Sequence, residues 1–327
     1  MADKICIDAD YFTLEQDHAA DDWQSDTMSL ASQITRGRIE NGRRSPSDEQ
    51  QFEAYETGTF SMSELVKDAG RCNATHFGLI DQIADLISSD AADMYPSAIV
   101  RGVDLFPPPV SWTPPNCVFE VDNLLQEWTW SEPFDLVFLR HMLGSFDSEG
   151  WSQLYKRCYD NLIPGGWIEQ LEFDINIMTD DNSMPADSPL ASWGDNFIDC
   201  AERAGRSLTV QKTMRTSIEN AGFVDVHEQL YKVPIGPWAK DKVLKEAGQL
   251  NYHHWVTGLE GYTMWLLTKF GAPTPWSVDE VQVYLAKVRA DLKKPSIHGW
   301  ELGRRIWARK PFAGEEKEEL VRPELSP

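Results

Sequence analysis

Short, continuous apolar runs that end in polar residues mark the middle of the chain. Three of them are Ala98–Val103 before Asp104, Cys117–Val121 before Asp122, and Phe134–Leu139 before Arg140 and His141. Trp167–Phe173 has the same character. Uninterrupted apolar runs bounded by turn signals are typical of strands buried in a parallel sheet. The pattern therefore predicts four neighbouring strands.

Helical patterns separate and follow these strands. In Ser148–Leu162, apolar residues recur every four positions, and the helix is expected to stop at Pro164-Gly165-Gly166. Further helices are predicted at about 188–204 and 207–221. Two late apolar segments, Phe223–Val233 and Arg304–Lys310, predict a closing antiparallel pair.

The order of these elements predicts an α/β fold: a doubly wound, mostly parallel sheet with an antiparallel edge strand. A helical insertion at about 239–293 interrupts the closing pair. We expect a loose acidic arm over residues 1–35, a single domain over 36–311 with a helical or coiled lead-in before residue 70, and a disordered tail over 312–327.

Composition narrows the classes of function. Lys and Arg number 30 against 52 Asp and Glu, a formal net charge of −22, which disfavours nucleic acid and anionic membranes as partners. The five cysteines are scattered without metal-ligand spacing, so we expect no metal site, and a reducing, cytoplasmic location is the simplest. Neither a signal peptide nor a membrane span is expected.

Ligands of doubly wound sheets bind at the carboxyl ends of the strands. The polar residues there are Asp104, Asp122, Arg140, His141 and Glu172. Each also has a structural interpretation: the aspartates as turn or helix caps, His141 as a satisfied structural histidine, and Glu172 as a surface residue.

Several stretches resemble the fungal LaeA-like methyltransferases, which are class I proteins with a Rossmann-like fold that use S-adenosylmethionine. The matching stretches are 94–98, 102–105, 112–117, 134–142, 164–169, 221–226, 232–238 and 307–311, with residues 40–44 resembling the family's N-terminal cap. The likeness covers about residues 36–311. It implies that Asp104 binds the cofactor ribose, that Asp122 lies near the adenine, and that Arg140 and His141 border the methyl-transfer site.

One motif departs from this resemblance. The family carries a strand followed by a glycine-rich loop, and the corresponding stretch here falls on Leu79–Leu86, with no glycine between Leu79 and Tyr95. Non-glycine residues at left-handed angles cost roughly 1–2 kcal/mol each, so a few of them would weaken cofactor binding by about one to four powers of ten. A continuous helix over 79–92 is predicted instead. A mis-spliced gene could mimic this loss, but the segment is coherently patterned. We therefore treat Asp104 and Asp122 as vestigial and expect no cofactor.

A methyltransferase scaffold without its cofactor is suited to a cofactor-independent cyclisation, such as a Diels–Alder or related pericyclic reaction, by analogy of fold. Such chemistry needs an apolar cavity that holds a reactive conformer, worth up to ~7–11 kcal/mol, and one donor to polarise a carbonyl. The candidate catalytic residues are His141, His254 and Arg140. The candidate pocket residues are Glu172, Tyr252, Trp255, Tyr262 and Trp265, for which an ordinary aromatic core stripe is the competing interpretation.

The expected partner is a hydrophobic small molecule of terpenoid or polyketide type, and a homodimer is compatible with the sequence. Two other functions remain open. One is an S-adenosylmethionine-dependent small-molecule methyltransferase with an atypical loop, which the retained aspartates favour. The other is a non-catalytic regulatory partner protein, which a filled pocket would favour.

Overall fold

The computed structural model describes residues 4–8, 38–40, 43–45, 61–66, 92, 95–105 and 113–315. The predicted helix over 79–92 lies outside these residues, except for Ala92, and so does most of the expected N-terminal arm. Side chains are described for these residues other than 38–40, 43–45, 61–66 and Tyr262.

Seven of the described strands form one sheet, in the order β5-β4-β3-β6-β7-β9-β8. The strands are β3 (Ser61–Val66), β4 (Val100–Asp104), β5 (Cys117–Val121), β6 (Phe134–Arg140), β7 (Leu162–Phe173), β8 (Val224–Pro234) and β9 (Trp300–Arg309). A separate antiparallel pair joins β1 (Arg38–Glu40) to β2 (Arg43–Ser45). The four predicted central strands and the closing antiparallel pair are confirmed, and with them the α/β, Rossmann-like class.

Strand β3 changes the expected topology at the centre of the sheet. It lies between β4 and β6 and runs antiparallel to both, so that Ser61 pairs with Asp104 and Val66 with Val100. Among the described strands, only β4–β5 and β6–β7 are parallel pairs, so the prediction of a mostly parallel sheet was wrong in this respect. Antiparallel neighbours do not need the crossover connection that parallel strands require, and alternation cannot distinguish the two directions. The predicted helical or coiled lead-in was likewise wrong where β1, β2 and β3 form.

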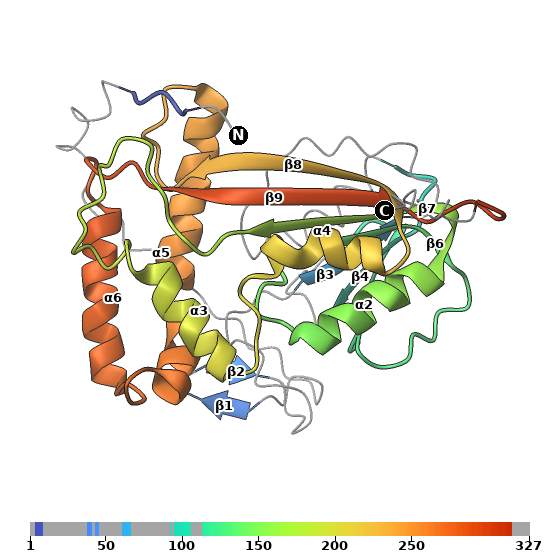
Figure 1. Cartoon of the computed structure of the whole chain (residues 1–327), viewed down its shortest axis with the longest axis horizontal. Helices are drawn as coiled ribbons and strands as arrows, with labels where there is room; N and C mark the ends of the chain where they lie inside the picture. Colours follow the sequence, from blue (N-terminus) through green and yellow to red (C-terminus); the bar gives the residue numbers. More distant parts are fainter. Residues whose placement is uncertain are drawn as a thin grey trace, which may run out of the picture.

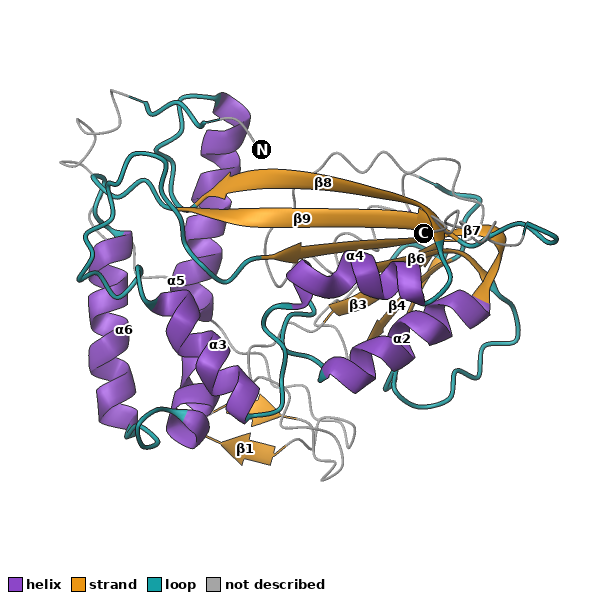
Figure 2. Cartoon of the chain, viewed as in Figure 1, coloured by secondary structure: helices purple, strands orange, loops and turns teal. Residues whose placement is uncertain are grey.

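The helices divide into two groups (Figure 1 and Figure 2). Helices α2 (Ser148–Asn161) and α4 (Val210–Asn220) lie along one face of the sheet. Helices α3 (Trp193–Arg203), α5 (Lys242–Phe270) and α6 (Val278–Leu292) gather at the end toward which β8 and β9 extend. The last two occupy the predicted insertion.

Each group of helices has its own apolar core. Between the sheet and helices α2 and α4, Leu154, Cys158 and Met214 pack against Ile168 and Ile306, and all five are fully buried. The second core joins the other three helices and includes Phe197, Leu259 and Leu285. Burial of such side chains contributes about 1.5–3 kcal/mol each relative to exposure. The insertion is therefore a packed subassembly and not a loose flap.

Helix α5 approaches the backbone of the loop after β8 at Gly248. A Cβ atom there would lie only 2.2 Å from the Gly236 carbonyl oxygen, so glycine permits the close contact. The Gly236 N–H donates to the Gly248 carbonyl oxygen over 2.9 Å. This contact fixes the helix against the end of β8.

The first described residues pack on the same region. Ile7 forms an antiparallel bridge with Ala239, and Ile5 is buried with Trp238 and Trp300. Residues 4–8 fall within the predicted loose arm, and they instead form part of this cluster, because two isoleucines cover apolar surface that would otherwise face water.

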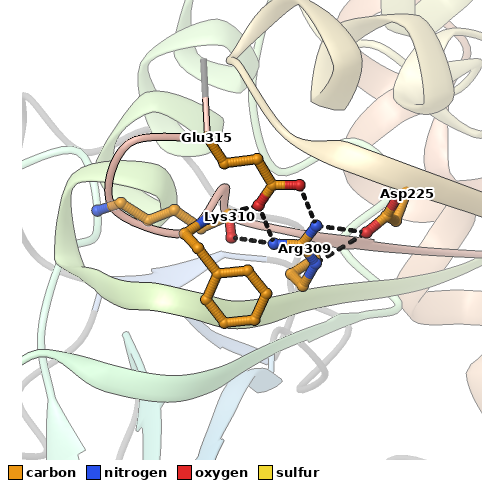
Figure 3. A network of polar contacts seen from close by, with 5 residues as sticks. Asp225, Arg309, Lys310 and Glu315 are labelled. Atoms are coloured by element: carbon orange, nitrogen blue, oxygen red, sulfur yellow. Dashed lines mark hydrogen bonds and ion pairs between the residues drawn. The ribbon is translucent and has the colours of Figure 1, made fainter. Parts of the chain in front are cut away.

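The segment after β9 folds back on the opposite edge of the sheet from the strand ends that carry Arg140 and Phe173. Figure 3 shows Arg309 between Asp225 and Glu315, and its guanidinium donates to both carboxylates over 2.6–2.8 Å. Lys310 Nζ donates to the carbonyl oxygens of Tyr159 and Leu162 at the end of α2, at 2.7 Å each. Residues 312–315 of the predicted disordered tail are thus held in place, and the rest of that tail lies outside the described residues.

Candidate functional site

His141 and His254 lie next to each other at the carboxyl edge of β6 and β7. His141 directly follows β6, and its ring stacks on Phe173 with centroids 5.0 Å apart and planes 13° apart. The ring of His254, on α5, lies 6.2 Å from that of His141. The structure therefore brings the two predicted catalytic histidines together from segments more than one hundred positions apart, and Arg140 is close enough to act on the charge of both.

The surroundings keep both imidazoles neutral. Burial lowers the pKa of His141 well below its usual range, and the charges of Arg140 and His254 lower it further. Burial, with Arg140 and His253 as smaller causes, lowers the pKa of His254 to about 4. Arg140 thus acts on both histidines. A neutral imidazole at pH 7 keeps one N–H donor and one acceptor nitrogen.

His141 presents a polar atom that the described residues do not bind. Its Nε2 is buried and has no hydrogen-bond partner within the described part of the chain. A buried, unsatisfied ring nitrogen carries a desolvation cost of about 1–3 kcal/mol, so such an atom in a native structure calls for an explanation. A bound ligand that hydrogen-bonds this nitrogen would remove that cost.

Glu172, which was predicted to line the pocket, is held by hydrogen bonds in the structure. Its side chain is fully buried, and both carboxylate oxygens accept a hydrogen bond from the Met142 N–H, at 3.0 and 3.1 Å. Burial raises the pKa of Glu172 to about 7, although bonds from Met142, Gln170 and Leu143 and the charge of Arg140 oppose the rise. The carboxylate contacts the backbone that follows His141.

The two predicted cofactor aspartates are neighbours at the ends of β4 and β5. The Asp122 N–H donates to the Asp104 carbonyl oxygen over 3.0 Å. Asp122 Oδ1 also accepts a bond from the Asn123 N–H over 2.7 Å, which is the local turn contact of the structural interpretation. Both positions fit the family's pattern, and the Asp122 carboxylate already has a local partner.

The tryptophans of the predicted pocket belong to the core. Trp255 packs on Trp193 with centroids 5.0 Å apart, and Trp265 packs on Phe270 at 5.1 Å. Both are buried in the core of α3, α5 and α6, so the competing interpretation, an aromatic core stripe, holds for them. Tyr252 is partly buried, and burial raises the pKa of its hydroxyl. The side chain of Tyr262 lies outside the described ones.

A second buried carboxylate, that of Glu301, was not predicted from the sequence. Glu301 on β9 accepts a bond from Asn251 Nδ2 over 2.9 Å, and Trp255 also hydrogen-bonds it. Burial raises the pKa of Glu301 to about 7. Asn251 Nδ2 is 3.0 Å from the Pro234 carbonyl oxygen as well, so this group ties α5 to β8 and β9. A single glutamate at the start of an apolar run gives no indication in the sequence that its carboxylate will be buried and bonded to Asn251.

Phe173 was also missed as a site residue. It occupies the last position of a predicted buried strand, where an aromatic side chain is expected to be part of the hydrophobic core. The structure places its ring under His141 and against Gly303, whose missing side chain leaves room for it.

The strand in the position that carries the family's cofactor-binding loop runs in a different direction here. In a doubly wound sheet the strand between those corresponding to β4 and β6 carries the glycine-rich loop at its carboxyl end. Here β3 takes that place in the reverse direction, and its amino end lies beside Asp104. The described residues therefore supply the two aspartates but not a loop in the family's position.

Among the described residues, no group of three or more His, Cys, Asp or Glu side chains could hold a metal ion. No helix in the same part of the chain is both long and apolar enough to cross a bilayer.

The sheet order, the covering helices and the polar residues at the strand ends define a protein of the Rossmann-like, class I methyltransferase fold. No model of a known protein family matches the chain. The methyltransferase pytC of Aspergillus terreus is 28% identical over 309 residues, covering 87% of this chain and 91% of the relative. The secondary metabolism regulator LAE1 of Cochliobolus heterostrophus is 34% identical over 227 residues, covering 68% of this chain and 72% of the relative. The chain belongs to the fungal LaeA-like methyltransferase family.

Similar solved structures are distant. A phosphoethanolamine N-methyltransferase of Haemonchus contortus has a TM-score of 0.33 at 14% identity, covering 60% of this chain and 38% of that protein. The [4+2]-cyclase SpnF has a TM-score of 0.32 at 15% identity, covering 71% and 65%. Likeness at this level adds nothing to the assignment.

Proposed function

We propose that this protein is a methyltransferase-fold enzyme of fungal secondary metabolism that acts without S-adenosylmethionine and cyclises a hydrophobic intermediate. The secondary-metabolic role is supported by relatives named as methyltransferases and as secondary metabolism regulators. The observation that carries the chemical part is the neutral His141–His254 pair, set against Phe173 at the ligand edge of the sheet.

A pericyclic ring closure suits this pair. It converts π bonds into σ bonds within one molecule, so no atom, proton or electron leaves or enters. The protein has to hold the reactive conformer and to donate a hydrogen bond to a carbonyl whose electron density rises in the transition state. In this proposal His141 or His254 is that donor, and Arg140 favours a carbonyl or carboxylate at the same position by its charge. Phe173 offers an apolar ring beside them.

Loss of the family's cofactor is supported by two observations. The sequence has no glycine between Leu79 and Tyr95. The strand in the loop-bearing place, β3, runs opposite to the direction that would deliver a loop to the aspartates. The proposed ring closure has no step that uses S-adenosylmethionine.

A methyltransferase is the second candidate, because Asp104 and Asp122 lie together where the family binds the cofactor and several relatives are named methyltransferases. A regulatory role is the third, since other relatives are named regulators.

Deletion of the gene in the producing fungus separates the three functions by the mass of what accumulates. Loss of a cyclase leaves an open-chain isomer with the same molecular formula as the lost product. Loss of a methyltransferase leaves a compound lighter by one CH₂, and loss of a regulator removes the whole product series without an intermediate. High-resolution mass spectrometry of the extracts is the measurement, and a compound lighter by CH₂ would overturn the proposal.

A further inference from the structure

We infer that Glu172 is a positioning residue, which holds the ring of His141 in place through the backbone of Met142. The inference rests on the proposed function in one respect, namely that His141 is the group that meets the substrate. The contacts that support it are independent of the reaction.

The backbone of His141 is in a conformation that needs support. Its φ is +52°, in the left-handed region, which costs a non-glycine residue roughly 1–2 kcal/mol. Such residues persist where the surrounding structure determines their conformation, and they are common at functional sites. The His141 N–H donates to the Leu171 carbonyl oxygen over 3.2 Å, so the peptide group before His141 is fixed by β7.

Glu172 fixes the peptide group after His141. The Met142 N–H lies 3.0 Å from Oε1 and 3.1 Å from Oε2, so the donor is shared by both carboxylate oxygens. Hydrogen bonds to an ionised acceptor are roughly twice as strong as neutral ones. With both adjoining peptide groups held, the left-handed turn at His141 has little freedom to relax.

Two successive residues of β7 thus act on His141 from different sides. Side chains alternate between the faces of a strand, so Phe173 and Glu172 point to opposite faces of the sheet. Phe173 supports the ring by stacking, and Glu172 holds the turn that carries the ring. Glu172 is fully buried, and the contact that links it to His141 is its bond from the Met142 N–H.

A buried polar chain restrains the carboxylate in turn. Gln170 Nε2 donates to Glu172 Oε1 over 3.2 Å, and the Tyr155 hydroxyl donates to Gln170 Oε1 over 2.7 Å. All three side chains are at most 1% exposed. The chain connects the turn at His141 to helix α2, which is part of the main core.

The charged and titratable groups that face Glu172 come from three elements. Arg140 on β6 and Tyr155 on α2 interact with it electrostatically, and Arg304 on β9 is its cross-strand neighbour. Burial raises the pKa of the carboxyl to about 7, so its ionisation, and with it the strength of the bond from Met142, changes near neutral pH.

The inference is tested by Glu172→Gln, with Glu301→Gln as the matched control at the other buried carboxylate. Protein with ¹⁵N-labelled histidine reports the His141 ring by NMR, and hydrogen exchange reports the Met142 amide. We expect Glu172→Gln to speed Met142 exchange by about tenfold, the loss of roughly one charge-assisted hydrogen bond. We also expect the wild-type His141 signals to shift between pH 6 and 8 and this shift to disappear in Glu172→Gln, while Glu301→Gln keeps both properties.

Unchanged Met142 exchange and an unchanged His141 pH profile in Glu172→Gln would overturn the inference. If Glu172→Gln does not fold, Glu172→Asp and the pH profile of the wild-type protein serve as the test. A wild-type His141 signal without an inflection near pH 7 would also overturn the inference. Product formation separates the two proposals. Turnover that survives a disturbed His141 ring contradicts the function proposed for His141, whereas an undisturbed ring contradicts only the positioning role.

Discussion

The ring of His141 stacks on the ring of Phe173, with centroids 5.0 Å apart and planes 13° apart. The contact joins the end of one parallel strand to the end of the next. It places a neutral imidazole, whose Nε2 has no partner among the described residues, on an apolar surface. In the proposed function, this arrangement polarises a ligand carbonyl without adding or removing a proton.

Replacement of both histidines should abolish product formation. Removal of a preorganised hydrogen-bond donor typically costs about 10²–10³ in rate, so His141→Ala with His254→Ala should reduce the product by at least that factor. The measurement is the yield of product relative to its open-chain isomer in the gene-deleted strain complemented with each variant. His253→Ala is the control, because that neighbouring side chain is exposed. Full yield from the double variant would exclude both histidines.

The pH dependence of stability should reveal the buried Glu172. Its folded-state pKa of about 7 lies above the ordinary 4.5, so the unfolded chain loses its proton first. Stability from this group is therefore present at low pH and falls as pH rises from about 4.5 to 7, by roughly 3 kcal/mol. Glu172→Gln should lack this fall, so its free energy of unfolding should improve relative to wild type between pH 5 and pH 8. Urea titrations at both pH values measure it. A difference between the two proteins that is the same at both pH values would mean that the carboxyl ionises with its ordinary pKa in the fold.

The buried His254 should make the free energy of unfolding depend on pH in the opposite direction. Its folded pKa of about 4 lies below the ordinary 6.5, so the unfolded chain binds a proton first as pH falls. The group therefore contributes stability above pH 6.5 that is lost toward pH 4, by roughly 3 kcal/mol. His254→Phe should become more stable relative to wild type as pH drops from 7.5 to 4.5. If the difference between the two proteins is constant with pH, the imidazole is not buried in neutral form.

Trp265 should prove structural. It is buried in the core of α3, α5 and α6, and truncation of such a side chain costs about 3–5 kcal/mol. Trp265→Ala should therefore lower the free energy of unfolding by that amount, while the folded fraction still shows wild-type His141 NMR signals. Normal stability together with disturbed His141 signals would instead place Trp265 at the ligand site.

The sequence predicts the strands whose neighbours are close in the chain. Apolar runs and turn residues mark β4 to β7 because strands covered by other elements carry largely uninterrupted apolar side chains, although the edge strand β5 leaves Val118 and Val121 exposed. The direction of β3 could not be obtained in this way, because pairing across the sheet depends on long-range backbone contacts. The same limit explains Trp255 and Trp265, since helical spacing shows that residues share a face but not whether a ligand or another helix covers it.

The candidate site was predictable only in part. Position at the carboxyl end of a strand singled out Arg140 and His141, and the aromatic insertion singled out His254; the structure places the two histidine rings 6.2 Å apart. The same rule could not predict that the Glu172 carboxylate accepts bonds from the Met142 N–H, because adjacent strand residues face opposite sides of the sheet and the rule does not say what covers either side. Glu301 and Asn251 carry no pattern in sequence, since their contact joins positions fifty residues apart.

Isothermal titration calorimetry with S-adenosylmethionine is the most direct test of the central claim, that the fold works without the family's cofactor. The measurement should use the full-length protein, with a LaeA-like relative that has the glycine-rich loop as the positive control. We predict no heat of binding for this protein up to millimolar ligand. Binding with a micromolar Kd would contradict the account and would make the methyltransferase the leading function.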